Sequence, residues 1–396
     1  MNGIDRCRQF TALLTTIICV LGAPASADVV TDWNKKACDI VLAAKPLTPV
    51  ANRTMAIVQT AVYEAVKASA EASPEAAVAA ANRAALTQLM PAQKEAIDHA
   101  YQEAIASIPN GDTKDTGIAI GEKAAARVIE RRAEDGAAAA ESYRPLTTPG
   151  VYVPTTIPAV PQWSQRKPWL LTSPSQFRPG APPALDSERW ARDFNEVKAL
   201  GAKEGSTRTA AQTEIARFWE ATLPPIYHGV VRSVADQPGR KVVRNARLFA
   251  AVTQAVDDAI IAIFDAKYHY NFWRPITAIR NGDRDGNYET EPNASWMPFI
   301  DTPMHPEYPC AHCILAATVA TILAADIGHG PMITLTTTSN TANGASRSWK
   351  TIEDFVQEVA VARIYDGVHY RNSSETGTAM GRQIGALAAK MHFGPP

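Results

Sequence analysis

The stretch that decides the fold is His305-Pro-Glu-Tyr-Pro-Cys310-Ala-His-Cys-Ile-Leu-Ala-Ala-Thr-Val-Ala-Thr-Ile-Leu-Ala-Ala-Asp326. From Ala311 to Asp326 the sequence is apolar nearly all round, which predicts a helix buried in the middle of a helical bundle. Pro309 ends the preceding loop, so the first N–H groups of this helix lack partners within the helix. Such a helix start can bind an anion through those N–H groups and the helix dipole.

Helical periodicity extends over most of the remaining chain. Apolar residues recur at spacings of three and four, and no alternating strand series or long repeat appears. Glycines at 377, 381 and 385 give the last helix a smooth face for close helix packing. The sequence therefore predicts an all-α fold of helical bundles. The clearest expected helices lie at about 55–65, 190–200, 242–267, 311–326 and 352–362, with a capping box at Thr209–Gln212.

A proline-rich stretch divides these helices into two regions. Residues 145–183 contain ten prolines, which exclude a helix or a central strand there. Trp163, Trp169 and Phe177 favour an irregular segment anchored along the surface, and the alternative is an exposed linker. We expect an N-terminal helical region at 28–144, this connecting segment at 145–183, and a C-terminal catalytic region at 184–396.

The first 27 residues have the layout of a secretory signal peptide. Arg6 and Arg8 precede an apolar run over 10–22, and Ala25-Ser26-Ala27 supplies small residues at a cleavage position. We therefore expect a secreted or periplasmic protein with no membrane span after cleavage. The formal net charge of the chain is −1, which excludes a global basic field for nucleic acid.

Two of the cysteines lie at the start of the buried helix. Cys310 and Cys313 could form a disulfide in an oxidising compartment, or remain thiols if they are buried. A zinc site made with His305 and His312 is the alternative. Its spacing is poor, because residues 310, 312 and 313 at a helix start point in divergent directions.

Three segments of the C-terminal region concentrate reactive side chains. Lys267 and Arg274 are seven residues apart, so both can lie on one face of a helix. His312 stands in the first turn of the buried helix. Asp366-Gly367 breaks the next helix, so Arg363 and His369 can face one cavity. Each segment also has an ordinary structural interpretation: a solvated pair, a structural histidine and a helix cap.

In this order, Lys-x6-Arg-Pro, Pro-x-x-His and Arg-x5-His resemble the superfamily of vanadium-dependent haloperoxidases and type 2 phosphatidic acid phosphatases. The similarity extends to Asp135-Gly136, Gln176–Pro179, Arg208–Trp219 and Lys267–Arg280, and it favours the soluble bacterial haloperoxidase-like branch. The resemblance implies that Lys267, Arg274 and Arg363 surround the oxygens of vanadate or phosphate. It implies that His312 is the acid–base histidine. His369 then matches the axial ligand of vanadium, or the nucleophile of the phosphatases.

One motif departs from the family pattern. Pro309-Cys310-Ala311-His312 stands where the family has Pro-Ser-Gly-His, so Cys310 and Ala311 occupy oxyanion-binding positions. We expect a Cys310 thiol to have a lowered pKa there, to repel the anion as a thiolate, and to oxidise beside activated peroxide. The residues after His369 supply no carboxylate to orient its ring, which leaves Asp257 or Asp258 as candidates.

The expected function is that of an exported enzyme that binds an oxyanion. With vanadate as cofactor it would use peroxide to oxidise a halide. The alternatives are an acid phosphatase that forms a phosphohistidine from a phosphate ester at the same site, and a non-catalytic descendant of the family. The expected partners are these small molecules, and an oligomer is possible.

Overall fold

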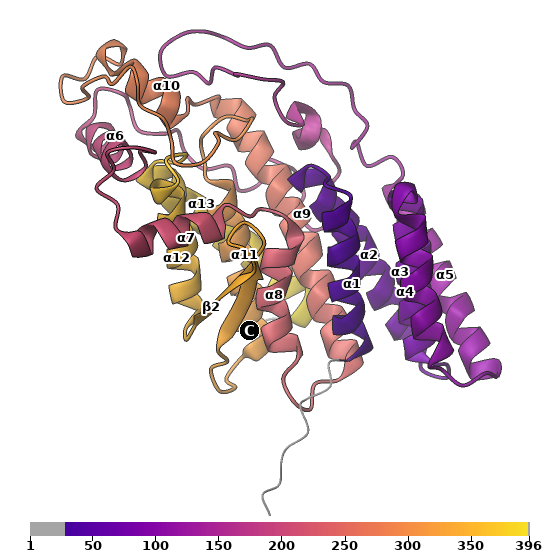
Figure 1. Ribbon diagram of the computed structural model, residues 1–396. Helices are drawn as coiled ribbons and strands as arrows, with labels where there is room; N and C mark the ends of the chain where they lie inside the picture. Colours follow the sequence, from indigo (N-terminus) through magenta and orange to yellow (C-terminus); the bar gives the residue numbers. More distant parts are fainter. Residues whose placement is uncertain (1–27, 395–396) are drawn as a thin grey trace, which may run out of the picture.

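The computed structural model describes residues 28–394, so the expected signal peptide at 1–27 lies outside the described residues. The described chain is mostly helical, as the sequence predicted, with the N-terminal helices on one side of the molecule (Figure 1). The N-terminal elements are α1 (Val29–Ala43), α2 (Thr48–Ala68), α3 (Pro74–Leu89), η1 (Pro91–Gln93), α4 (Lys94–Ala106), α5 (Asp112–Arg132) and η2 (Pro161–Gln165). The C-terminal elements are α6 (Glu188–Leu200), α7 (Ala210–Trp219), α8 (Pro224–Ala235), α9 (Val242–Tyr270), α10 (Pro275–Arg280), η3 (Gly282–Arg284), α11 (Ala311–Ile327), β1 (Leu335–Ser339), β2 (Ala345–Trp349), α12 (Ile352–Tyr365) and α13 (Arg371–Phe393).

Two long apolar helices form the centre of the molecule. α11 is buried along almost its whole length, and α9 packs on one side against α2 and on the other against α11 and α13. Apolar surface that recurs on every side of a helix is stable only when neighbours cover all of it, which explains the central position of α11. In residues 28–394, no helix is long and apolar enough to cross a membrane.

The contact between α11 and α13 depends on three glycines of α13. A Cβ atom added at Gly381 would lie 2.3 Å from the carbonyl oxygen of Ile314. At Gly377 it would lie 2.5 Å from the carbonyl oxygen of Cys310, and at Gly385 2.6 Å from Cβ of Thr321. The predicted smooth face of the last helix therefore lies directly against the backbone of α11.

A two-stranded hairpin interrupts the helices, which the sequence analysis did not predict. β1 and β2 pair antiparallel, with Leu335 opposite Trp349 and Ser339 opposite Ala345. Side chains of β1 alternate between buried and exposed. The buried side chains include Thr337 and Ser339, whose hydroxyls donate to carbonyl oxygens of α8 and α7. The apolar alternation that signals a strand is absent because the inward side chains are polar and hydrogen-bonded.

The proline-rich segment contains no regular element except η2 and runs across the top of the view in Figure 1. Two carboxylates of α9 hold it in place. Asp258 accepts hydrogen bonds from the backbone N–H groups of residues 169–171, at 2.6 to 2.9 Å. Arg166 donates to Asp257 at 2.6 Å and to Asp135 at 2.7 Å. Trp163 is buried in the main core, and Trp169 and Phe177 pack against that core.

The glycine contact can be tested with Gly381→Ala. At an exposed helix position this change stabilises a protein by about 1 kcal/mol, because alanine has the higher helix propensity. Here we expect a loss of about 1–3 kcal/mol in unfolding free energy, since the new methyl group meets the backbone of α11. Chemical denaturation of the variant gives the value, with Gln383→Ala on the exposed face of the same helix as the control. An unchanged or increased stability would contradict the close contact.

Candidate oxyanion-binding site

The structure brings the three reactive segments together in the C-terminal region. Nη1 of Arg274 lies 3.4 Å from Nε2 of His369. Arg363, His312, His369 and Ala311 line one cavity of about 300 Å³. The start of α11 faces this cavity, since both Ala311 and His312 belong to its first turn.

Lys267 and Arg274 reach the site from different elements. α9 ends at Tyr270, and Asn271 has the left-handed conformation (φ 48°), so the chain turns before Arg274. Arg274 is the N-cap residue of α10. The prediction that both cations share one helix face is therefore wrong, because a turn separates them.

Both side chains hold the loop that leads into α11. Nζ of Lys267 donates to the carbonyl oxygens of Pro306 and Glu307, at 2.9 and 2.7 Å. Nε of Arg274 donates to the carbonyl oxygen of His305 at 2.9 Å, and Nη1 donates to that of Val368 at 2.8 Å. Neither cation lines the cavity surface itself.

Burial lowers the pKa of both cations. It lowers the pKa of Lys267 well below its usual value, and the neighbouring Arg274 lowers it further. Burial likewise lowers the pKa of Arg274 to about 10. Desolvation disfavours the charged form of each group, and an anion placed beside them would favour that form again.

Arg363 lies in the last turn of α12 and is almost completely buried. Its Nη1 donates to the carbonyl oxygen of Trp219 at 2.8 Å and to Asp366 at 2.6 Å. Burial raises the pKa of Asp366 to about 7, against the lowering effect of Arg363. Nε of Arg363 has no hydrogen-bond partner in residues 28–394.

His312 presents a second unpartnered atom. It is 4% exposed, and its Nε2 has no hydrogen-bond partner in the part of the chain that the structure describes. Burial, and next the charge of Arg363, lower its pKa well below the usual value. The ring is therefore neutral, and it can accept a proton once negative charge is present beside it.

His369 is oriented by a residue that the sequence analysis did not identify. Its Nδ1 lies 2.7 Å from Oε1 of Glu307, which also accepts the backbone N–H of Tyr370 at 3.1 Å. An ionised Glu307 can only accept, so Nδ1 then carries the proton and Nε2 keeps its lone pair, on the side where Arg274 lies. Burial raises the pKa of Glu307 to about 7 and lowers that of His369 well below its usual value.

The expectation that Asp257 or Asp258 orients His369 is therefore wrong. Both accept hydrogen bonds from the proline-rich segment. Asp257 accepts from Arg166, and Asp258 accepts from the backbone N–H groups of residues 169–171. Glu307 stands two residues before Pro309 in the loop that the sequence analysis quoted. Its apolar surroundings and its contact with His369 arise only when that loop folds against the start of α13.

At the start of α11, Cys310 and Cys313 form a disulfide with their Cα atoms 5.4 Å apart. Of the two alternatives left open by the sequence, the structure has the bridge, so the expected Cys310 thiol with a lowered pKa is absent. Sγ of Cys310 accepts the N–H of Cys313 at 3.2 Å, and its side chain does not line the cavity. In residues 28–394, no three His, Cys, Asp or Glu side chains form a cluster suited to a metal ion.

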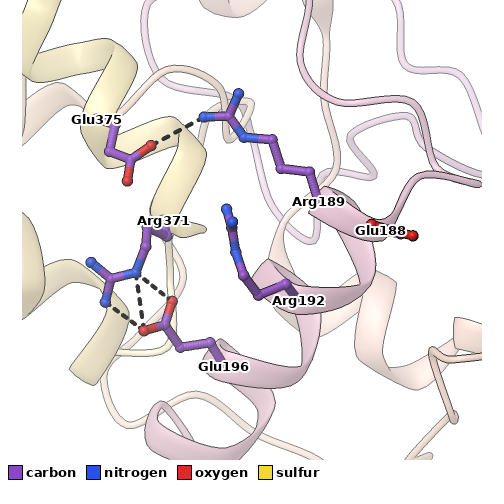
Figure 2. A pocket seen from close by; sticks show the side chains of 6 residues that line it. All are labelled: Glu188, Arg189, Arg192, Glu196, Arg371 and Glu375. Carbon is purple, nitrogen blue, oxygen red and sulfur yellow. Dashed lines mark hydrogen bonds and ion pairs between the residues drawn. The ribbon is translucent and has the colours of Figure 1, made fainter.

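Ion pairs in a surface pocket outside the cavity hold the start of α13, just after His369. Figure 2 shows Arg371 paired with Glu196 of α6, and Arg189 paired with Glu375 of α13. Arg192 pairs with Asp193, whose other oxygen accepts the backbone N–H of Asn372 at 2.9 Å. Every arginine of this pocket thus has a carboxylate partner, and these contacts join α6 to the start of α13.

Part of the chain matches a known family of proteins. Residues 247–394 match the family described as the VCPO second helical-bundle domain. Vanadium chloroperoxidase of Curvularia inaequalis is 25% identical over 174 residues, which is 38% of this chain and 28% of that protein. The chain therefore matches less than a third of that relative's length.

Solved structures show the same fold over nearly the whole chain. A bacterial vanadium-dependent iodoperoxidase superposes with a TM-score of 0.78 and 23% identity, covering 91% of this chain and 95% of that one. The apo form of a bacterial vanadium-dependent chloroperoxidase has a TM-score of 0.73 and 17% identity, covering 88% and 94%. The resemblance stated from the sequence is confirmed: this chain has the fold of the bacterial vanadium-dependent haloperoxidases, and its residues 247–394 form a domain of the vanadium chloroperoxidase type.

Proposed function

We propose that the protein is an exported vanadate-dependent haloperoxidase, with residues 1–27 directing its export and residues 184–396 carrying catalysis. The observation that carries the proposal is the pair of buried unpartnered atoms, Nε of Arg363 and Nε2 of His312, on side chains that line the same cavity as His369. Buried polar groups normally have partners, so unpartnered ones that share a cavity suit a polar ligand.

The residues present fit vanadate. A tetrahedral oxyanion needs several donors, and Arg363 and the N–H groups at the start of α11 would supply them from the cavity lining. Arg274, beside His369, and Lys267 would add positive charge next to the lining. A ligand to vanadium needs a free lone pair, and Nε2 of His369 has one because Nδ1 donates to Glu307. Vanadate bound there supplies the Lewis-acid centre at which hydrogen peroxide becomes able to oxidise a halide.

The protein's own side chains would then perform three tasks. Arg363 and Arg274 neutralise the anion, whose charge also favours the protonated form of Lys267. Glu307 keeps the ring of His369 in one tautomer. His312 accepts a proton from hydrogen peroxide at Nε2. It then returns this proton to the peroxide oxygen that leaves as water.

One observation favours a second candidate function, phosphate-ester hydrolysis through a phosphohistidine. The contact of 2.7 Å between Glu307 and His369 orients the ring and leaves Nε2 unprotonated, as a nucleophile requires. Paired assays distinguish the two: halide oxidation by peroxide that requires added vanadate supports the haloperoxidase. Hydrolysis of a phosphate monoester without vanadate, with phosphate trapped on His369, supports the phosphatase.

Vanadate should raise the melting temperature of the protein with increasing concentration, since a ligand of the folded state stabilises it by RT ln(1 + [L]/Kd). We expect His369→Ala to abolish this increase, measured against the variant's own melting temperature. His99→Ala is the matched control, because His99 is exposed on α4. An unchanged response in His369→Ala would contradict the ligand role and leave binding to the cations alone.

Glu307→Gln tests the orientation of His369 with almost no change in side-chain shape. Loss of a carboxylate behind a ligating histidine typically weakens metal binding by about 10- to 100-fold. We expect a decrease in vanadate affinity of this size, measured by the same thermal titration. Nitrogen NMR of the His369 ring should show a single tautomer, protonated at Nδ1, in the wild type and a mixture in the variant. Unchanged affinity would show that Glu307 has only a structural role.

The disulfide gives a third test. If it fixes the start of α11, Cys310→Ser and Cys313→Ser should each weaken vanadate binding, because the first-turn N–H groups lose their fixed positions. A reductant should have the same effect on the wild type and none on the variants. Mass spectrometry of the exported protein checks the bridge. Tighter binding in Cys310→Ser would show instead that a hydroxyl donor at this position matters more than the bridge.

A further inference from the structure

The cavity has a wall that vanadate, peroxide and halide do not require. Beyond His312, Arg363 and His369, it is lined by apolar side chains of α9, α11 and the loop before α11, among them Ile263, Phe264, Leu315 and Met304. Ions and peroxide are hydrated and gain nothing from an apolar wall. An apolar organic group would gain about 25 cal/mol for each Å² it buries there. Its volume of about 300 Å³ suits a small organic molecule.

Two carboxylates stand on the same wall. Glu220, just after α7, and Asp301, in the loop before α11, both line the cavity and are exposed. Neither side chain has an ion pair or hydrogen bond with any described residue of the chain. Exposed carboxylates alone would signify little, but here they share a cavity with the unpartnered Nε2 of His312, which is buried.

The cavity therefore has three kinds of surface. The cations and histidines lie at the oxyanion site, the apolar side chains form a wall, and negative charge stands on the exposed part of the lining. A complementary ligand has a reactive apolar body and a positively charged group. Once an oxyanion occupies the cationic end, Glu220 and Asp301 favour a positively charged group over a negative one at the apolar wall.

We propose that the cavity binds an organic ammonium compound with an apolar body of about one ring system, and that this compound is the substrate that is halogenated. The proposal rests on the haloperoxidase function. The reaction is R–H + X⁻ + H₂O₂ + H⁺ → R–X + 2 H₂O. A C–H bond of the ring breaks and a C–X bond forms. The halide supplies two electrons, the O–O bond of peroxide is reduced, and the released proton ends in water.

Binding tests the proposal independently of turnover. Calorimetric titration of the full protein, with and without vanadate, compares 2-phenylethylamine, neutral 2-phenylethanol and anionic 3-phenylpropanoate. With vanadate at the oxyanion site, we expect the amine to bind most tightly and the carboxylate most weakly. Exposed charge pairs contribute little, so each of Glu220→Gln and Asp301→Asn should weaken amine binding by about fivefold or less and leave the alcohol unaffected.

A second variant tests the place of binding. Ala159 lines the cavity, and it is held there by its N–H donating to the carbonyl oxygen of Met304 at 2.6 Å. Ala159→Phe should fill the cavity and abolish binding of all three probes while the vanadate-induced rise in melting temperature persists. Ala181→Phe is the matched control, because Ala181 is exposed on the same segment and does not line the cavity.

The outcomes separate this proposal from the haloperoxidase function. Amine binding no tighter than alcohol binding, or unchanged amine binding in the Glu220→Gln/Asp301→Asn double variant or in Ala159→Phe, overturns it. If vanadate fails to stabilise the wild type while the amine binds as expected, the haloperoxidase function is wrong and the organic site stands. With both confirmed, peroxide and halide should convert the bound amine to one ring-halogenated product, and Ala159→Phe should lose that selectivity.

Discussion

Buried positive charge is the constraint on which the rest of this structure depends. Lys267, Arg274 and Arg363 are each at most 1% exposed, and an isolated buried charge is very costly. The chain offsets this cost with carbonyl oxygens of the loop before α11 and with the buried carboxylates Glu307 and Asp366. Each of these partners also fixes a backbone segment. The contacts that stabilise the buried charges therefore also determine the shape of the site.

The same contacts explain why helices far apart in the chain must meet at close range. The loop before α11 has to lie against the start of α13 for Glu307 to reach His369. α13 can approach only because glycine faces the backbone of α11. The ion pairs of Figure 2 fasten the start of α13 from the other side. Packing between these helices and the geometry of the site therefore cannot change independently.

Much of this was readable in the sequence, because periodicity and helix breaks are local. The buried helix at 311–326, the glycine face of the last helix and the meeting of Arg363 with His369 follow from such patterns. The contact between Glu307 and His369 does not, since it joins residues 62 positions apart through tertiary packing. The prediction that Lys267 and Arg274 share a helix face was wrong for a local reason. Asn271 adopts a left-handed conformation, which the spacing of charged residues does not reveal.

The cavity is lined by two parts of the chain, of which only one matches the known domain. Every residue that would hold the oxyanion lies within 247–394, the part that matches the known domain. Leu47 and Pro49 before and within α2, Ala159 of the proline-rich segment, and Glu220 lie outside it. Substitutions at these positions can therefore reshape the cavity without changing any residue of the part that matches the known domain. An isolated 247–394 fragment would keep Lys267, Arg274 and Arg363 and would lose that part of the cavity lining.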